Sequence, residues 1–227
     1  MATEERTFLP ALRFRALTPL FDPVVRVTLR ERAFKRRLLD AAAVAPGEEV
    51  LDIGCGTGTL ALMLAEREPE AQVTGLDADP EILSRARAKA AATGARVDFV
   101  EGLSSSLPFE DNSFDVVLSS LFFHHLPPAG KRATAAEVRR VLRPGGRLHV
   151  ADFGRAADPA MAAAFLVVRM IDGFETTADN ARGALPAVFA GAGLEDARVE
   201  DQLRTPLGSL ALYRAVRPPV AASLPRS

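Results

Sequence analysis

The chain has 227 residues, of which 48% are hydrophobic and 25% charged. This length and apolar content suit one large α/β domain with its own core. The 28 basic and 29 acidic side chains give a formal net charge of -1, so no overall field attracts nucleic acid. Cys55 is the single cysteine, which excludes an intramolecular disulfide and a zinc site built from several cysteines.

The first residues, MATEERTFLP, carry acids where a secretory signal needs basic residues. No later run approaches the roughly 18 apolar residues of a membrane-spanning helix. We therefore expect a cytoplasmic protein. Residues 11–40 contain eight basic side chains against three acidic ones. Such a segment can lie on an anionic membrane surface, but the favoured interpretation is an ordinary solvated helix face.

From about residue 47, short apolar runs alternate with alanine-rich helical patterns, which is typical of repeated βα units and a parallel sheet. Helices are predicted at 59–67, 80–93 and 131–142. Asp79 is the expected N-cap of the second helix, and Gly94 its expected stop. Five short strands fit the apolar runs, at residues 49–53, 72–76, 96–100, 114–118 and 147–153.

The pattern changes after residue 154. Two helices are predicted at 161–170 and 185–190, followed by extended runs at 195–200 and 209–216. The connection between these runs is too short for a parallel crossover, so we expect the sheet to end in an antiparallel strand. Three parts are expected, namely a helical cap over residues 1–46, the main domain over 47–217 and a flexible tail over 218–227.

The most informative stretch is VLDIGCGTG, residues 50–58, where a strand runs directly into glycines and then a helix. Glycines at 54, 56 and 58 allow a tight turn and let a ligand touch the main chain. The G-x-G-x-x-G dinucleotide fingerprint would need a sixth-position glycine where this chain has Thr59. A nicotinamide-dependent oxidoreductase is therefore disfavoured.

Two carboxylates accompany the loop. Asp52 would sit badly beside a pyrophosphate but suits a cationic or amine-bearing ligand. Asp77 falls at the tip of the second strand, where a carboxylate accepts hydrogen bonds from both hydroxyls of a ribose. The alternative role for Asp77 is to cap the next helix, for which Asp79 is better placed. The sequence thus predicts a ligand with a ribose and an amine.

The motifs VLDIGCGTG, GLDADPEIL, VDFVEG, LPFEDNSFDVVLSSLFFHHLP and LRPGGRLHVADF occur in this order over about residues 48–155. They resemble the class I S-adenosylmethionine (SAM)-dependent methyltransferases, and among them the small-molecule branch of ubiquinone and menaquinone C-methyltransferases. The resemblance implies a Rossmann-like, doubly wound, mostly parallel seven-stranded sheet and a methyltransferase domain that transfers the methyl group of SAM to a small molecule. A SAM-binding sensor or subunit without turnover is the alternative.

The resemblance also implies a set of cofactor residues. The glycine loop would pack on the methionine part and ribose of SAM, and Asp77 would hold the ribose. Leu103 stands where the family commonly has an aspartate at the adenine, which leaves the backbone amide of Ser104 to meet the ring. The full predicted set is Asp52, Gly54, Cys55, Gly56, Gly58, Asp77, Ala78, Leu103, Ser104 and Ser119.

Methyl transfer from a sulfonium is a direct displacement that needs alignment but no obligatory side-chain nucleophile or metal. His124 and His125 follow the fourth strand and are candidate general bases; the alternative is that they only shape the pocket. Asp152 is a further candidate base or substrate contact. Aromatic and apolar residues could form a cover for an apolar quinone-like, lipid-like or polyketide-like acceptor, although plain core is the favoured interpretation: Phe14, Phe21, Phe34, Phe165, Met170 and Phe174.

Overall fold

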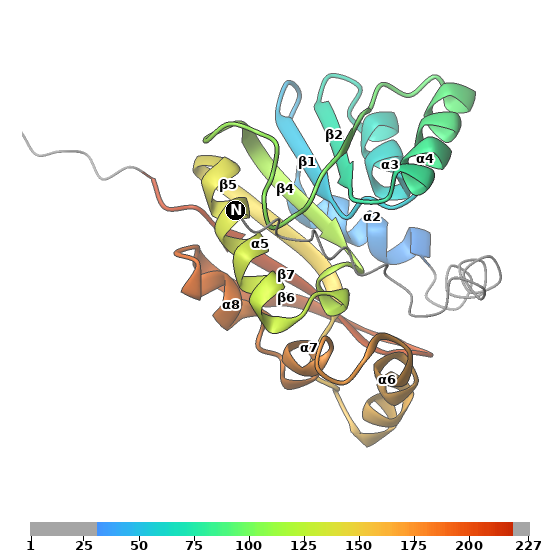
Figure 1. Cartoon of the computed structure of the whole chain (residues 1–227), viewed down its shortest axis with the longest axis vertical. Coiled ribbons are helices and arrows are strands. Elements are labelled where there is room, and N and C mark those ends of the chain that lie inside the picture. The colour runs from blue at the N-terminus through green and yellow to red at the C-terminus, as the bar shows by residue number, and fades with distance from the viewer. Residues whose placement is uncertain (1–30, 220–227) are drawn as a thin grey trace, which may run out of the picture.

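The computed structural model describes residues 31–219 and contains one seven-stranded sheet with the order β3-β2-β1-β4-β5-β7-β6 (Figure 1). The strands are β1 Glu49–Ile53, β2 Gln72–Asp77, β3 Asp98–Glu101, β4 Phe114–Ser120, β5 Leu142–Phe153, β6 Glu195–Thr205 and β7 Gly208–Val216. The helices are α2 Glu31–Ala42, α3 Thr59–Arg67, α4 Pro80–Thr93, α5 Pro128–Val141, α6 Pro159–Asp172, α7 Ala178–Arg182 and α8 Leu185–Gly191, with a short 3₁₀ turn, η1, at Phe123–His125.

Parallel pairing joins the strands from β3 to β5, and β7 is antiparallel to both of its neighbours, β5 and β6. The predicted sheet, mostly parallel with an antiparallel last strand, is confirmed. The last strand in chain order is not at the edge of the sheet. It lies between β5 and β6, so β6 forms the edge.

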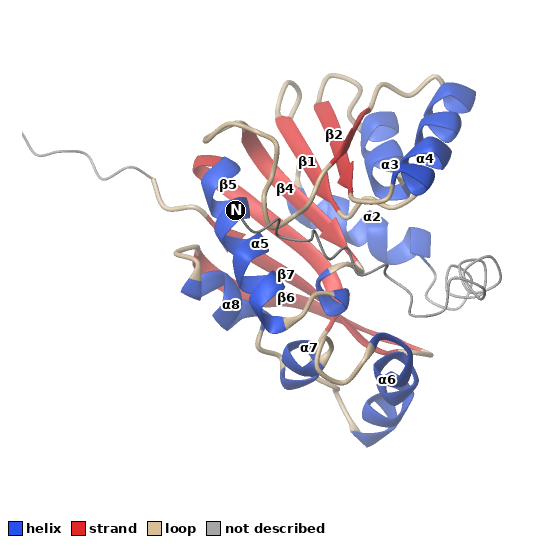
Figure 2. Ribbon diagram, in the orientation of Figure 1, coloured by secondary structure: helices blue, strands red, loops and turns tan. Residues whose placement is uncertain are grey.

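Helices cover both faces of the sheet (Figure 2). Alternate residues of β1 pack on opposite faces, as the twofold period of a strand requires. Leu51 and Ile53 belong to the cluster that includes side chains of α5 and α8. Val50, the residue before Leu51 in β1, belongs to the cluster on the other face, which includes side chains of α2 and α3. Helices thus cover the sheet on both faces. The place left for a ligand is beyond the carboxyl ends of the strands.

Most predicted element bounds agree with the structure within a few residues. Helix α5, predicted at 131–142, begins earlier than expected, at Pro128, because proline suits the first turn of a helix. Helix α6 likewise begins at Pro159, where the Asp158 side chain accepts a hydrogen bond from the Met161 amide at 3.0 Å. Asp79 and Gly94 bound α4 as predicted.

Of the predicted cap over residues 1–46, only α2 and the turn after it fall within the described residues. Phe14, Phe21, most of the basic segment and most of the predicted tail lie outside them. Phe34 of α2 is buried in the core, so it is not available as a cover over a ligand. Across residues 31–219, the helices are all too short or too polar to cross a bilayer.

Candidate functional site

The strand order reverses between β1 and β4. From β1 the chain proceeds to β2 on one side, and from β4 it proceeds to β5 on the other. In open α/β sheets, ligands bind outside the carboxyl ends of the strands at such a switch point. The glycine loop leaves the end of β1, and η1 follows the end of β4. The predicted cofactor and catalytic residues therefore lie together at the carboxyl ends of the central strands.

All three loop glycines adopt the left-handed region, with φ of 66° at Gly54, 55° at Gly56 and 75° at Gly58. Only glycine takes this conformation without strain. A Cβ at Gly54 would collide with the Phe122 ring, and one at Gly58 would collide with Phe99. A Cβ at Gly56 would meet no described atom within 4 Å. Gly56 is therefore the glycine of the loop with room for a ligand against its backbone.

Asp77 ends β2 and faces this loop. Its Oδ2 accepts a hydrogen bond from the Gly56 amide at 2.9 Å, and its Oδ1 accepts one from the Asp79 amide at 3.0 Å. Burial raises the pKa of Asp77, and the backbone donors oppose that shift. A carboxylate has about four acceptor sites, so two amides leave capacity for ribose hydroxyls. Asp77 thus fixes the loop as well as being placed for a ligand.

Asp52 is 1% exposed, and neither side-chain oxygen makes a hydrogen bond of ordinary geometry to a described residue. Burial raises its pKa to about 7; the Lys35 ammonium opposes this shift, and the Asp77 carboxylate adds to it. A buried carboxylate without a partner is costly unless a ligand supplies one. The SAM ammonium is a group of the required charge, so the residues present fit this cofactor.

The remaining predicted cofactor residues differ in their contacts and in their exposure. The Ser119 hydroxyl donates to the Ile53 carbonyl at 3.0 Å, and the Ser104 hydroxyl bonds to that of Thr134 at 2.8 Å. Leu103 is 40% exposed, so its side chain is accessible to a ligand, and its place at the adenine stays a prediction. Ala78 joins Asp77 to the α4 cap. Burial, reinforced by the Asp52 charge, raises the pKa of the Cys55 thiol, so it would be a poor nucleophile.

The chain turns sharply after β4. Leu121 adopts a φ of 54°, a strained conformation for a residue with a side chain. The turn brings the Phe122 ring over Gly54 and places η1 next to β5. His124 is buried there, and its Nδ1 lies 2.7 Å from Asp152 Oδ1. Two of the three catalytic candidates, His124 and Asp152, are thus brought together as a pair.

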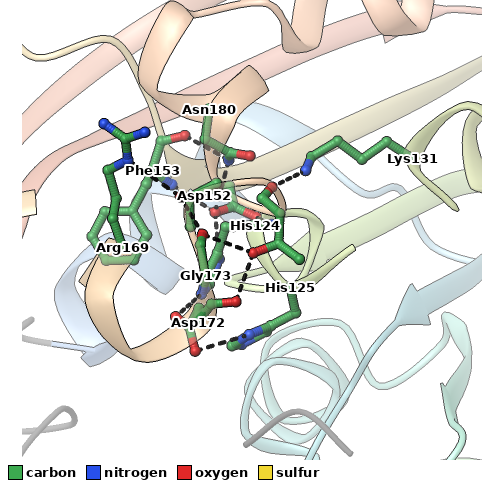
Figure 3. Close-up of polar contacts among 11 residues, drawn as sticks. His124, His125, Lys131, Asp152, Phe153, Arg169, Asp172, Gly173 and Asn180 are labelled. Atoms are coloured by element: carbon green, nitrogen blue, oxygen red, sulfur yellow. Dashed lines mark hydrogen bonds and ion pairs between the residues drawn. The ribbon is translucent and has the colours of Figure 1, made fainter. Parts of the chain in front are cut away.

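Asp152 is fully buried and held by several donors. The Phe153 amide lies 2.7 Å from its Oδ1, the Asn180 side-chain amide 3.3 Å from the same oxygen, and the His124 amide 3.2 Å from its Oδ2. These contacts come from η1, β5 and α7 (Figure 3). Asp152 is therefore placed to orient His124 rather than to accept a proton from an acceptor directly.

Asp172, at the end of α6, joins the cluster although the sequence gives no signal for it. Its Oδ2 lies 3.6 Å from His124 Nε2, and its Oδ1 lies 3.5 Å from His125 Nδ1. The two imidazole rings are 4.0 Å apart, centre to centre. Figure 3 shows Asp172 facing both histidines. His149, by contrast, is buried within β5 and stands apart from this cluster, 3.6 Å from Glu200.

The pKa values of the two histidines are shifted in opposite directions. Burial alone would lower the pKa of His124, but the Asp152 carboxylate raises it above its ordinary value. Burial and the neighbouring His124 charge lower the pKa of His125, against the opposing effect of Asp172. The His125 side chain is 26% exposed and that of His124 is 5% exposed. His125 is consequently the more accessible and the more readily neutral of the pair.

Comparison with known proteins agrees with this geometry. A family model described as a methyltransferase domain matches residues 50–146. The demethylmenaquinone methyltransferase of Thermus thermophilus is 39% identical over 142 residues, covering 62% of this chain and 64% of that protein. The ubiquinone/menaquinone biosynthesis C-methyltransferase UbiE of Dinoroseobacter shibae is 37% identical over 139 residues, covering 59% of this chain and 54% of that protein.

A solved SAM-dependent methyltransferase of Methanosarcina mazei is 25% identical, with a TM-score of 0.65, and covers 80% of this chain and 97% of that one. The fold is that of the class I SAM-dependent methyltransferases, and residues 50–146 carry their methyltransferase domain. Within this class, the chain resembles the ubiquinone and menaquinone C-methyltransferases. The match spans less than two thirds of the length of either of those two relatives.

Proposed function

We propose that this chain transfers the methyl group of SAM to an apolar small-molecule acceptor, with a quinol-type ring as the favoured class. The observation that carries the proposal is the pairing of Gly56, whose Cβ position is open, with the buried Asp52 and the half-buried Asp77 at the switch point of the sheet. The Asp52 oxygens make no hydrogen bond of ordinary geometry to a described residue and would receive the ammonium. Asp77 would receive the ribose.

The acceptor side is supported by position and polarity. The cluster of His124, His125, Asp152 and Asp172 lies beyond β4 and β5 at the same edge as the glycine loop. Next to Asp172, the side chains of Met170 and Phe174 are 62% and 52% exposed. Of the aromatic and apolar residues expected from the sequence to form a cover, these two are accessible to a ligand, whereas Phe165 is buried in the core. An apolar ring could lie against them with its oxygen toward the histidines.

SAM supplies the methyl group on a positively charged sulfur when it is bound. The residues of the chain bind and orient: Asp52 and Asp77 fix the two polar ends of the cofactor, and the glycine loop sets its depth. The histidine cluster would hold an acceptor oxygen and favour its deprotonated form. Alignment of this kind supplies about 7 to 11 kcal/mol in favourable systems, so no covalent intermediate with the protein is needed.

The test is incubation of the purified chain with methyl-labelled SAM and a panel of hydroquinones, naphthohydroquinones and non-quinol phenols, followed by mass spectrometry. We expect labelled quinol products together with S-adenosylhomocysteine. Gly56→Val serves as the control without a cofactor site. If only the phenols gave labelled product, the acceptor class would be phenols and not quinols. If the chain failed to bind SAM, the proposal would be refuted.

A further inference from the structure

Three potential metal ligands, His124, His125 and Asp172, lie close together beyond β4. Atoms of His124, His125 and Asp172, one from each residue, all lie within 4.8 Å of one another. The Asp172 oxygens are 3.6 Å from His124 Nε2 and 3.5 Å from His125 Nδ1. Both separations exceed an ordinary hydrogen bond. Asp172 therefore faces both histidines at ion-pair distances, longer than those of short hydrogen bonds.

These separations match the geometry of a bound ion. Zinc binds imidazole nitrogen and carboxylate oxygen at about 2.0 to 2.2 Å. In a tetrahedral site with such bonds, the ligand atoms are about 3.4 Å from one another, as follows from the tetrahedral angle. The distances from Asp172 to the two histidines involve its two different oxygens and are close to this value. All three ligand atoms lie within 4.8 Å of one another, so a bound ion would draw them closer together.

Asp152 supplies the outer contact that histidine ligands usually have. A metal-bound histidine donates its other ring N–H to a carboxylate or carbonyl, which fixes the tautomer and directs the free nitrogen at the ion. Here His124 Nδ1 lies 2.7 Å from Asp152 Oδ1, and Asp152 is itself held by the Phe153 amide and Asn180. This arrangement leaves His124 Nε2 directed toward Asp172, and an ion that binds there would displace any proton from this nitrogen.

From this geometry we propose that His124, His125 and Asp172 bind one divalent transition-metal ion, with Asp152 positioning His124. Two imidazoles and one carboxylate favour zinc, iron(II), cobalt(II) or manganese(II) over magnesium or calcium, which prefer oxygen ligands. Three protein ligands leave at least one position open, as in catalytic zinc sites. The exposure of His125 gives an ion a route from solvent.

A role for the ion at the acceptor rests on the proposed function, whereas ion binding does not. In that role an acceptor hydroxyl would occupy the open position as its oxyanion. Its O–H bond would break, the proton would leave to solvent, and the lone pair would remain on the oxygen. A ring carbon would then form a bond to the methyl carbon of SAM as the sulfur–methyl bond breaks, which leaves the sulfur as a neutral thioether. The hydrogen on that ring carbon would leave to solvent as a proton, which restores the aromatic ring.

The test uses the full chain without a histidine tag, first stripped of metal. Zinc affinity is measured by competition with a chromophoric chelator, and cobalt(II) is followed by its visible absorption. We expect one ion per chain, and at least a tenfold loss of affinity in His125→Ala and in Asp172→Asn. Glu175→Gln, an exposed acid on the same connection, is the matched control and should bind as the parent does.

Circular dichroism and thermal unfolding of each variant show whether it is folded. Absence of saturable zinc and cobalt binding by the folded parent would overturn the proposal, as would undiminished affinity in both folded variants. Ion binding lost in these variants supports the site even if no methylated product is found. Methyl transfer at the full rate by the metal-stripped chain would overturn the role at the acceptor.

Discussion

The Phe122 ring lies directly over Gly54, so that a Cβ added to this glycine would be 2.3 Å from the Phe122 Cδ2 atom. The contact ties the cofactor loop after β1 to the turn that carries the histidines. Gly54→Ala should therefore move η1 as well as strain the loop. A movement at one half of the site would be transmitted to the other half.

The matched control for this change is Gly47→Ala, because Gly47 has a φ of 79° and open space at its Cβ position. In both variants the left-handed conformation should lower the free energy of unfolding by about 1 to 2 kcal/mol. In Gly54→Ala the collision with Phe122 should lower it by about 1 to 3 kcal/mol more. Chemical denaturation measures the difference in the free energy of unfolding. Equal destabilisation would contradict the described position of Phe122.

Gly56→Val should abolish SAM binding, because the branched side chain would occupy the space reserved for the ligand. Its cost to folding should resemble that of Gly47→Val, since neither added side chain meets described atoms at the Cβ position. Calorimetry with SAM and denaturation of both variants separate the two effects. If Gly56→Val bound SAM with the affinity of the parent, the ligand would have to lie elsewhere.

Asp77→Ala should weaken SAM binding by about 1.5 to 3 kcal/mol, or roughly 10- to 150-fold, through loss of charge-assisted hydrogen bonds. The Gly56 amide also loses its acceptor, so part of this loss comes from the loop. Asp79→Ala is the control: it removes the α4 cap, at about 1 kcal/mol of folding stability, and should leave SAM affinity nearly unchanged. Equal affinities of these two variants would exclude a role for Asp77 in binding.

The Asp52 carboxyl, whose pKa burial raises to about 7, should make SAM affinity depend on pH. The ammonium binds best to the ionised carboxylate, so binding releases a proton from the fraction of free protein that is neutral. Affinity should rise between about pH 6 and pH 8, by up to about tenfold per unit below the pKa. Calorimetry in buffers of different ionisation enthalpy measures the released proton. The dependence should vanish in Asp52→Asn.

The same group affects folding with a definite sign. Its pKa in the folded state lies above the value of about 3.9 in the unfolded chain. The neutral form stabilises the fold, and this contribution is lost as pH rises from about 4 to about 7. Asp52→Asn should therefore stabilise the free protein at about pH 8, by roughly 2 to 4 kcal/mol. A destabilised Asp52→Asn protein would show that the carboxylate is satisfied internally.

Replacing His125 with alanine should lower turnover about 10²- to 10⁴-fold, because the acceptor oxygen would lose a group that favours its deprotonated form, with SAM affinity nearly unchanged. The basis is the accessible position of His125 beside Asp172. Single-turnover methyl transfer and calorimetry give the two quantities on one preparation. If His124→Asn and His125→Ala both keep turnover within a few-fold of the parent, the histidines only line the pocket and alignment carries the reaction.

The sequence predicts local features of this site well and distant ones poorly. The glycine loop, Asp77 and the Asp79 cap are recognisable because each feature is contained within a few residues that fold against one another. The contact of Asp172 with His125 joins α6 to η1, and no periodicity or motif encodes that meeting. The same holds for the ring of Phe122 over Gly54, which depends on the left-handed turn at Leu121.

The position of β7 has a consequence for how the site is assembled. Its residue Ala211 pairs with Asp152, and its Tyr213 hydroxyl donates to the Phe153 carbonyl at 3.2 Å. Yet β7 is the last strand in chain order. Until it emerges from the ribosome and inserts, the β5 edge is open and prone to pair with other chains. We expect the histidine cluster to reach its final arrangement only at this late step, after the cofactor loop has formed.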